Sequence, residues 1–124
     1  MTSKYESADL LLKLYDLRRE PVMREARAWF RNDFRPETAE DVLSTYRGKE
    51  SAFYRMVTTY WNMAAGLVLH GAIDEHMFSA VNGEHLMVYR RLRPFLGELR
   101  AALDNPGYLD NLERLATAAA VKPK

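Results

Sequence analysis

The sequence contains no cysteine among its 124 residues. This excludes disulfide bonds, thiolate metal sites and a cysteine nucleophile. A chain without thiols also fits the reducing environment of a bacterial cytoplasm, which is the location we expect.

The sequence also lacks an excess of charge and a long apolar run. Its 18 basic and 17 acidic residues leave a net charge of +1, too small to draw the whole protein to nucleic acid or anionic lipid. The most apolar window, Met63 to Leu69, is far shorter than the ~20 residues that span a bilayer. The first residues show no basic segment followed by an apolar run. We therefore expect a soluble protein with neither a signal peptide nor a membrane span.

No segment of four or more residues alternates apolar and polar side chains as β-strands do. Instead, apolar residues from Phe53 to Val68 and from Val88 to Leu103 recur with helical spacing. Two long amphipathic helices must bury their apolar faces, and a chain of this length can build an independent core. The predicted fold is all-α, a single compact bundle of six to seven helices over residues 1–124, with 116–124 as a frayed tail.

Capping residues and glycines predict where the helices begin and end. Thr38 with Asp41 forms a capping box, and Asp74 is a suitable N-cap. Gly48 and Gly71 are suited to left-handed conformations at helix ends. The expected helices cover 3–19, 21 to 32–34, 38–48, 50–70, 75–81, 84–103 and a last segment from 108.

The first two predicted helices differ in the side chains that they direct to the core and to solvent. The first is expected to bury its leucines, and the second to expose arginines on the side away from the core. The leucines are Leu10, Leu11, Leu14 and Leu17, and the arginines are Arg24, Arg27 and Arg31.

Pro94 lies inside the apolar phase of residues 84–103. Its ring crowds the carbonyl group four residues earlier, and it lacks a backbone N–H. We therefore predict one long helix with a kink at Arg90–Arg91 rather than two separate helices.

The three histidines, His70, His76 and His85, are spaced by six and nine residues. Metal-binding histidines on one helix are usually three or four residues apart, so no metal site is predicted, and the histidines are expected to face solvent or anchor loops. The sequence has no nucleophile–base pair, phosphate loop or dinucleotide fingerprint. No catalytic residue, no cofactor and no enzyme activity are therefore predicted.

Arginines of the kinked helix form a candidate basic surface. Arg90, Arg93 and Arg100 share one stripe because their offsets of three and ten are near whole turns. Such a stripe can bind phosphate groups. The alternatives are an ordinary charged face or ion pairs with acids of neighbouring helices, such as Asp16, Glu25 or Asp110.

Aromatic side chains of the central helices form a candidate pocket. Tyr60, Trp61 and Tyr89 can line a ligand site, although such residues more often belong to the core with a hydroxyl at its rim. Trp61 lies midway along the helix with the most regular apolar face. We therefore expect it at the bundle centre.

The carboxy-terminal half resembles a group of small all-helical bacterial proteins that have no assigned function. The resemblance rests on an ordered set of features: a helix ending Leu67-Val68-Leu69-His70-Gly71, then Ile73-Asp74, Tyr89 to Leu92 before Pro94, Arg100, and the turn Asn105-Pro106-Gly107-Tyr108. It implies a helical bundle and no catalytic residues. Some members of that group carry an amino-terminal membrane anchor, which is not expected for this chain.

These features together favour a protein–protein interaction module, with a homodimer as one form. Outer helices are expected to expose apolar side chains such as Phe34, Tyr46 or Phe78, and an exposed patch of that kind marks a partner surface. Two alternatives stay open: a nucleic-acid-associated regulator that uses the arginine stripe, which the balanced charge disfavours, and a small-ligand-binding bundle that uses the aromatic pocket.

Overall fold

The computed structural model describes residues 3–121, and the side chains of residues 3–118. Its regular structure is helical throughout that range, which confirms the all-α prediction. A 3-10 turn, η1, joins α6 to α7, and if these three count as one kinked helix the bundle has seven. The elements are α1 (Lys4–Arg18), α2 (Pro21–Asn32), α3 (Ala39–Arg47), α4 (Ser51–Leu69), α5 (Glu75–Val81), α6 (Glu84–Leu92), η1 (Arg93–Phe95), α7 (Leu96–Ala102) and α8 (Asp110–Val121).

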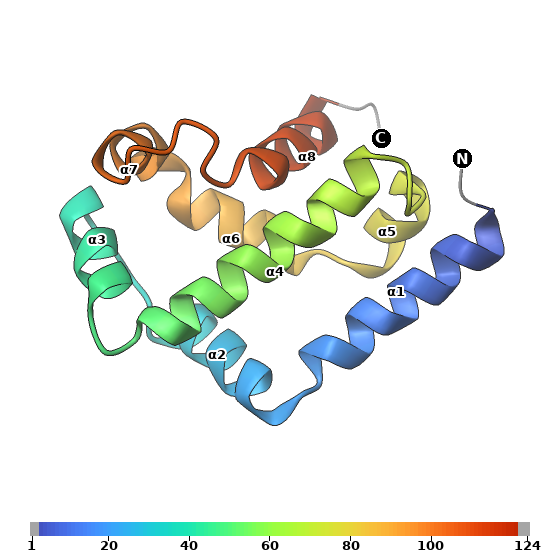
Figure 1. The fold of residues 1–124 in the computed structure, drawn as a ribbon, viewed down its shortest axis with the longest axis horizontal. Coiled ribbons are helices and arrows are strands. Elements are labelled where there is room, and N and C mark those ends of the chain that lie inside the picture. Colours follow the sequence, from blue (N-terminus) through green and yellow to red (C-terminus); the bar gives the residue numbers. More distant parts are fainter. Residues whose placement is uncertain (1–2, 122–124) are drawn as a thin grey trace.

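Helix α4 runs through the middle of the bundle, and the other helices surround it (Figure 1). Trp61 is 1% exposed, as expected for the centre of the core. At Gly66 the absence of a side chain makes room for Asn111 of α8, because a Cβ there would lie 2.9 Å from Nδ2 of the Asn111 side chain. Asn62 of α4 accepts a 3.0 Å hydrogen bond from the Leu112 N–H. The first turn of α8 is therefore capped by a side chain from another helix.

The predicted caps are present in the structure. Thr38 and Asp41 form the capping box of α3, and Asp74 accepts from the Met77 N–H at the start of α5. Gly71 has the left-handed conformation expected after α4, with φ of 82°. The prediction for Gly48 is wrong: its backbone is extended, and glycine is required there because a Cβ would lie 2.8 Å from the Ser44 carbonyl oxygen.

The chain bends at Pro94 without leaving helical geometry, which confirms a proline kink. The irregular turn is Arg93–Phe95, one turn later than the predicted Arg90–Arg91. The Leu96 N–H bonds to the Arg93 carbonyl in 3-10 fashion, which tightens the chain around the residue that has no donor. In Figure 1, α6 and α7 point in clearly different directions.

Two aromatic residues expected at the surface are buried instead. Phe34 stacks on Trp29 and contacts Phe30 and Tyr54, and Phe78 packs edge-on against Trp61. Phe34 follows α2, and Phe78 lies in the short helix α5. Both segments fold against the core, so each buries its aromatic side chain. Tyr46, the third residue expected there, is half-buried against the core.

Helix α1 presents a narrower stripe to the core than its leucines suggest. Ser7, Leu11 and Leu14 are buried, whereas Leu10 is only partly buried and Leu17 is 55% exposed. The prediction that Leu17 is buried is wrong, because the stripe of α1 facing the core runs along residues 7, 11, 14 and 18.

The last helix begins at Asp110, two residues after the expected start, since Leu109 adopts a left-handed backbone with φ of 56°. Helix α8 continues to Val121, so most of the segment expected to fray is helical. Residues 122–124 of that segment lie outside the described residues. Within residues 3–121, no helix has the length and apolar character needed to cross a membrane.

His85 is buried, contrary to the expectation that all three histidines face solvent or anchor loops. It is 2% exposed between Trp61 and Phe78, and its Nδ1 has no hydrogen-bond partner among the described residues. Burial lowers the pKa of His85 from 6.5 to about 4, because the charged imidazolium loses its water shell.

We predict that acid destabilises the protein through His85. The unfolded chain takes up this proton near pH 6.5 and the folded chain only near pH 4. The free energy of unfolding therefore falls as pH drops through this window, by up to about 3 kcal/mol from this group. Urea unfolding at pH 7 and pH 4.5 measures the loss. His85→Phe, which keeps a ring beside Phe78, should lose less over the same interval, and an equal loss in both proteins would contradict the assignment to His85.

Candidate functional site

The structure separates the three arginines of the predicted basic surface. Arg90 and Arg93 are exposed, whereas Arg100 points to α8. Its Nη2 lies 2.9 Å from Glu113 Oε1, and its Nε donates to the Tyr108 carbonyl at 2.9 Å. The prediction of one stripe assumed a regular helix, and the 3-10 turn at Pro94 lies between Arg93 and Arg100. Arg100 therefore holds the turn before α8 in place.

The aromatic residues of the predicted pocket lie in the core. Tyr60, Trp61 and Tyr89 are all buried. The Tyr60 hydroxyl donates to the Leu14 carbonyl, and its burial raises the pKa of Tyr60 to about 12. The Trp61 ring is packed against Tyr60, Phe78 and His85, so its faces are occupied by protein.

A partly buried carboxylate, Glu84, connects three helices. At the start of α6, its Oε2 accepts from Trp61 Nε1 of α4 at 2.9 Å and from Arg27 Nε of α2 at 2.9 Å. Oε1 accepts from Arg27 Nη2 at 3.1 Å and lies 3.5 Å from Arg31 Nη1. Arg27 thus binds the carboxylate with two parallel N–H groups, the strongest geometry available to this pair.

Helix α1 joins the same network through Arg18. The Arg18 guanidinium donates to Asn82 Oδ1 at 2.8 Å and lies over the Trp61 ring, 5.6 Å from its centroid. The Arg18 carbonyl accepts from Arg27 Nη1 at 3.4 Å. Sequence reasoning identified neither Glu84 nor Arg18, because the partners of both are 9 to 64 residues away in the chain.

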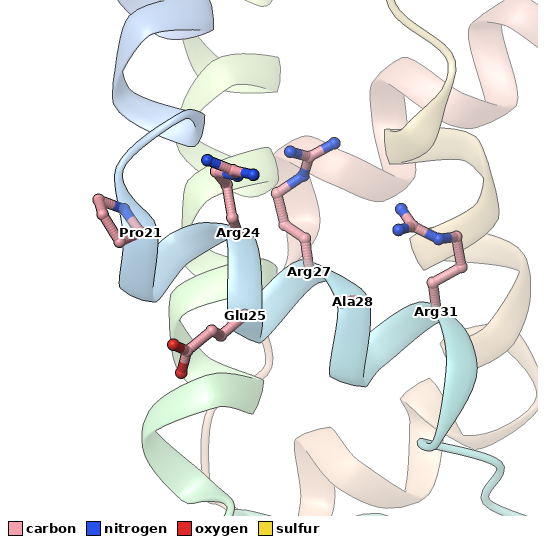
Figure 2. Close-up of a pocket in the computed structure, with 6 residues that line it drawn as sticks. All are labelled: Pro21, Arg24, Glu25, Arg27, Ala28 and Arg31. Atoms are coloured by element: carbon pink, nitrogen blue, oxygen red, sulfur yellow. The ribbon is translucent and has the colours of Figure 1, made fainter.

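Three arginines of α2, which we call the arginine row, line an open depression of about 550 Å³. They are Arg24, Arg27 and Arg31, spaced by three and four residues. Figure 2 shows their guanidinium groups on one side of α2, with the Glu25 carboxylate on the opposite side. The sequence predicted that these arginines lie on an outer face. It did not predict that Glu84 would bind two of them.

A second surface, which we call the apolar surface, lies around α1. Its members are the exposed side chains Leu12, Tyr15, Leu17, Met63 and Val81. Leu12, Tyr15 and Val81 line a groove of about 300 Å³ between α1 and the end of α5. Leu17 and Met63 line another of about 520 Å³, with Met23 and Met56 as further walls. The grooves therefore lie between α1 and two different sets of neighbours.

The described residues contain no cluster of three His, Asp or Glu side chains placed to hold a metal ion. His70 and His76 are exposed and His85 is in the core. The histidines therefore do not form a common site.

We predict that Glu84→Ala destabilises the fold by about 2–3 kcal/mol, because it leaves the half-buried Arg27 and the buried Trp61 N–H without their acceptor. Urea unfolding followed by circular dichroism measures the loss. Asp9→Ala is the control, since it removes the exposed Lys13–Asp9 pair and should change stability by less than about 0.5 kcal/mol. Equal losses in the two variants would show that Glu84 is not a structural centre.

The family model described as "Domain of unknown function (DUF4760)" matches residues 5–119. Neither the curated proteins nor the solved structures contain a significant match. The match includes both halves of the chain, whereas the resemblance found in the sequence covered only the carboxy-terminal half. The chain belongs to the DUF4760 family, whose function is unknown.

Proposed function

We propose that this protein acts by binding rather than by catalysis, as a protein–protein interaction module in a bacterial cytoplasm. The observation that carries the proposal is the position of the exposed large apolar side chains. Four are on α1, one begins α2, and the other two line the grooves beside α1. They are Tyr5, Leu12, Tyr15, Leu17, Val22, Met63 and Val81. Single exposed apolar residues are ordinary, but a gathering of them marks a contact surface.

Helix α1 is attached to the bundle by polar contacts and a narrow apolar stripe. Ser7 accepts from the Asp74 N–H at 3.1 Å, the Leu14 carbonyl accepts from Tyr60, and Arg18 binds Asn82. Only Leu11 and Leu14 are buried apolar side chains of this helix. Leu10 is partly buried, whereas Tyr5, Leu12, Tyr15 and Leu17 are exposed and available to a partner.

The partner we propose is a second copy of this chain, with the two α1 helices antiparallel. Residues 4–10 carry two acidic side chains and one basic, whereas residues 12–19 carry two exposed basic side chains, Lys13 and Arg19, and one acidic, with Arg18 engaged at Asn82 and Trp61. Antiparallel pairing places the acidic half of one helix against the basic half of the other. Leu12, one residue past the middle of α1 and 66% exposed, would meet its own copy at the two-fold axis, as an isologous interface requires.

The test is the oligomeric state in solution. Light scattering should give about twice the monomer mass of 14.4 kDa, falling towards the monomer value over roughly a hundredfold dilution. Leu12→Glu places two carboxylates at the proposed axis and should give a monomer at every concentration, because like charges and buried charge both oppose contact.

Ala101→Glu is the matched control, since it puts the same charge on an exposed position of α7. It should leave the mass unchanged. A wild-type protein that is monomeric throughout, or a dimer that survives Leu12→Glu, would overturn the proposed interface.

A further inference from the structure

We propose that the arginine row on α2 is a binding site for a small ligand that carries a dianionic phosphate group. The site would use the guanidinium groups of Arg24 and Arg31, with Arg27 fixed between them. It lies in the open depression shown in Figure 2 and does not depend on self-association through α1.

The three arginines differ in how firmly they are held. Arg27 gives two N–H groups to Glu84 and a third to the Arg18 carbonyl, so its guanidinium is fixed in position. Arg31 is about half exposed and reaches Glu84 only at 3.5 Å. Arg24 is exposed and has no ion pair among the described residues. The two outer arginines can therefore turn to a ligand while the central one stays in place.

The arginine row has more positive than negative charge around it. Within the described part of the chain, Glu84 is the one carboxylate that forms ion pairs with the row, through Arg27 and Arg31. It also accepts a hydrogen bond from Trp61. Glu25 also lines the depression, with its carboxylate on the opposite side of α2 from the guanidinium groups (Figure 2). Three guanidinium groups against the carboxylates of Glu84 and Glu25 leave a net charge of +1, and the nearby Arg35 and Arg91 add to it, so the depression attracts a phosphate group, which is an anion near neutral pH.

Further positive charge lies at the carboxy-terminal end of the row. Arg91 donates to the Phe30 and Arg31 carbonyls that end α2. Its own burial and the charge of nearby Arg35 lower the pKa of Arg91. These two cations raise the positive potential beside Arg31 and give an approaching anion further attraction.

The guanidinium groups of the row suit the oxygens of a phosphate group. The planar fork of a guanidinium matches two oxygens of a phosphate group, whereas a lysine offers only a point charge. Arg24 and Arg31 are seven residues apart on one face, or about 10.5 Å along the helix. Both side chains are long enough to meet a phosphate placed above Arg27. A nucleic-acid strand would need a longer run of free cations than the two that remain.

The test uses isothermal titration of the full chain with inorganic pyrophosphate, and with a nucleoside diphosphate to find whether the phosphate source matters. The double variant Arg24→Gln/Arg31→Gln should bind either probe at least about tenfold more weakly, because it loses two charge-assisted contacts. Both side chains lie at the surface, and an unchanged melting temperature will show that the variant is folded.

Lys49→Gln/Arg114→Gln is the matched control, since it removes two exposed positive charges from the α3–α4 connection and from α8. It should bind like the wild type. Equal weakening in the two double variants, or no binding of pyrophosphate by the wild type, would overturn the site. Tighter binding of a single-stranded oligonucleotide than of either phosphate probe, abolished by the arginine substitutions, would also overturn it in favour of a nucleic-acid surface.

Discussion

The arrangement of the amino-terminal half depends on one partly buried carboxylate. Glu84 has its side chain 13% exposed, and a carboxylate so far from water is stable only when its oxygens are satisfied. Arg27, Arg31 and Trp61 meet that requirement from two other helices. Its place in the first turn of α6 adds the favourable field of the helix amino terminus. One ionised group thereby fixes the rotation of α2 and α4 against α6.

The two surfaces that carry the proposals follow from this constraint. Because Glu84 holds the central arginine of α2, the same face of the helix presents Arg24 and Arg31 to solvent. Because Arg18 is used over Trp61 and at Asn82, the core-facing stripe of α1 ends in a polar residue. Leu12 and Leu17 lie beside that stripe, so they face solvent and line the grooves.

Local signals were sufficient for much of the fold. The capping box of Thr38, the N-cap of Asp74 and the left-handed Gly71 were predicted correctly, since each involves residues within a few positions along the chain. The burial of Trp61 followed from helical phase alone. Where several helical phases fit the same leucines, as in α1, local spacing does not decide which face is buried. Leu17 was therefore assigned to the core although it is exposed.

By itself the sequence determined the helices, most of their ends and the central position of α4, because spacing and capping act over a few residues. Tertiary structure alone decided which polar groups meet. Arg27 and Glu84 are 57 residues apart and Arg18 and Asn82 are 64, and no periodicity connects such pairs. It also decided that the arginine row lines a depression and that Arg100 turns away from Arg90 and Arg93 to bind Glu113. The reason is that the turn at Pro94 changes the helix direction between Arg93 and Arg100, whereas α2 has no such interruption.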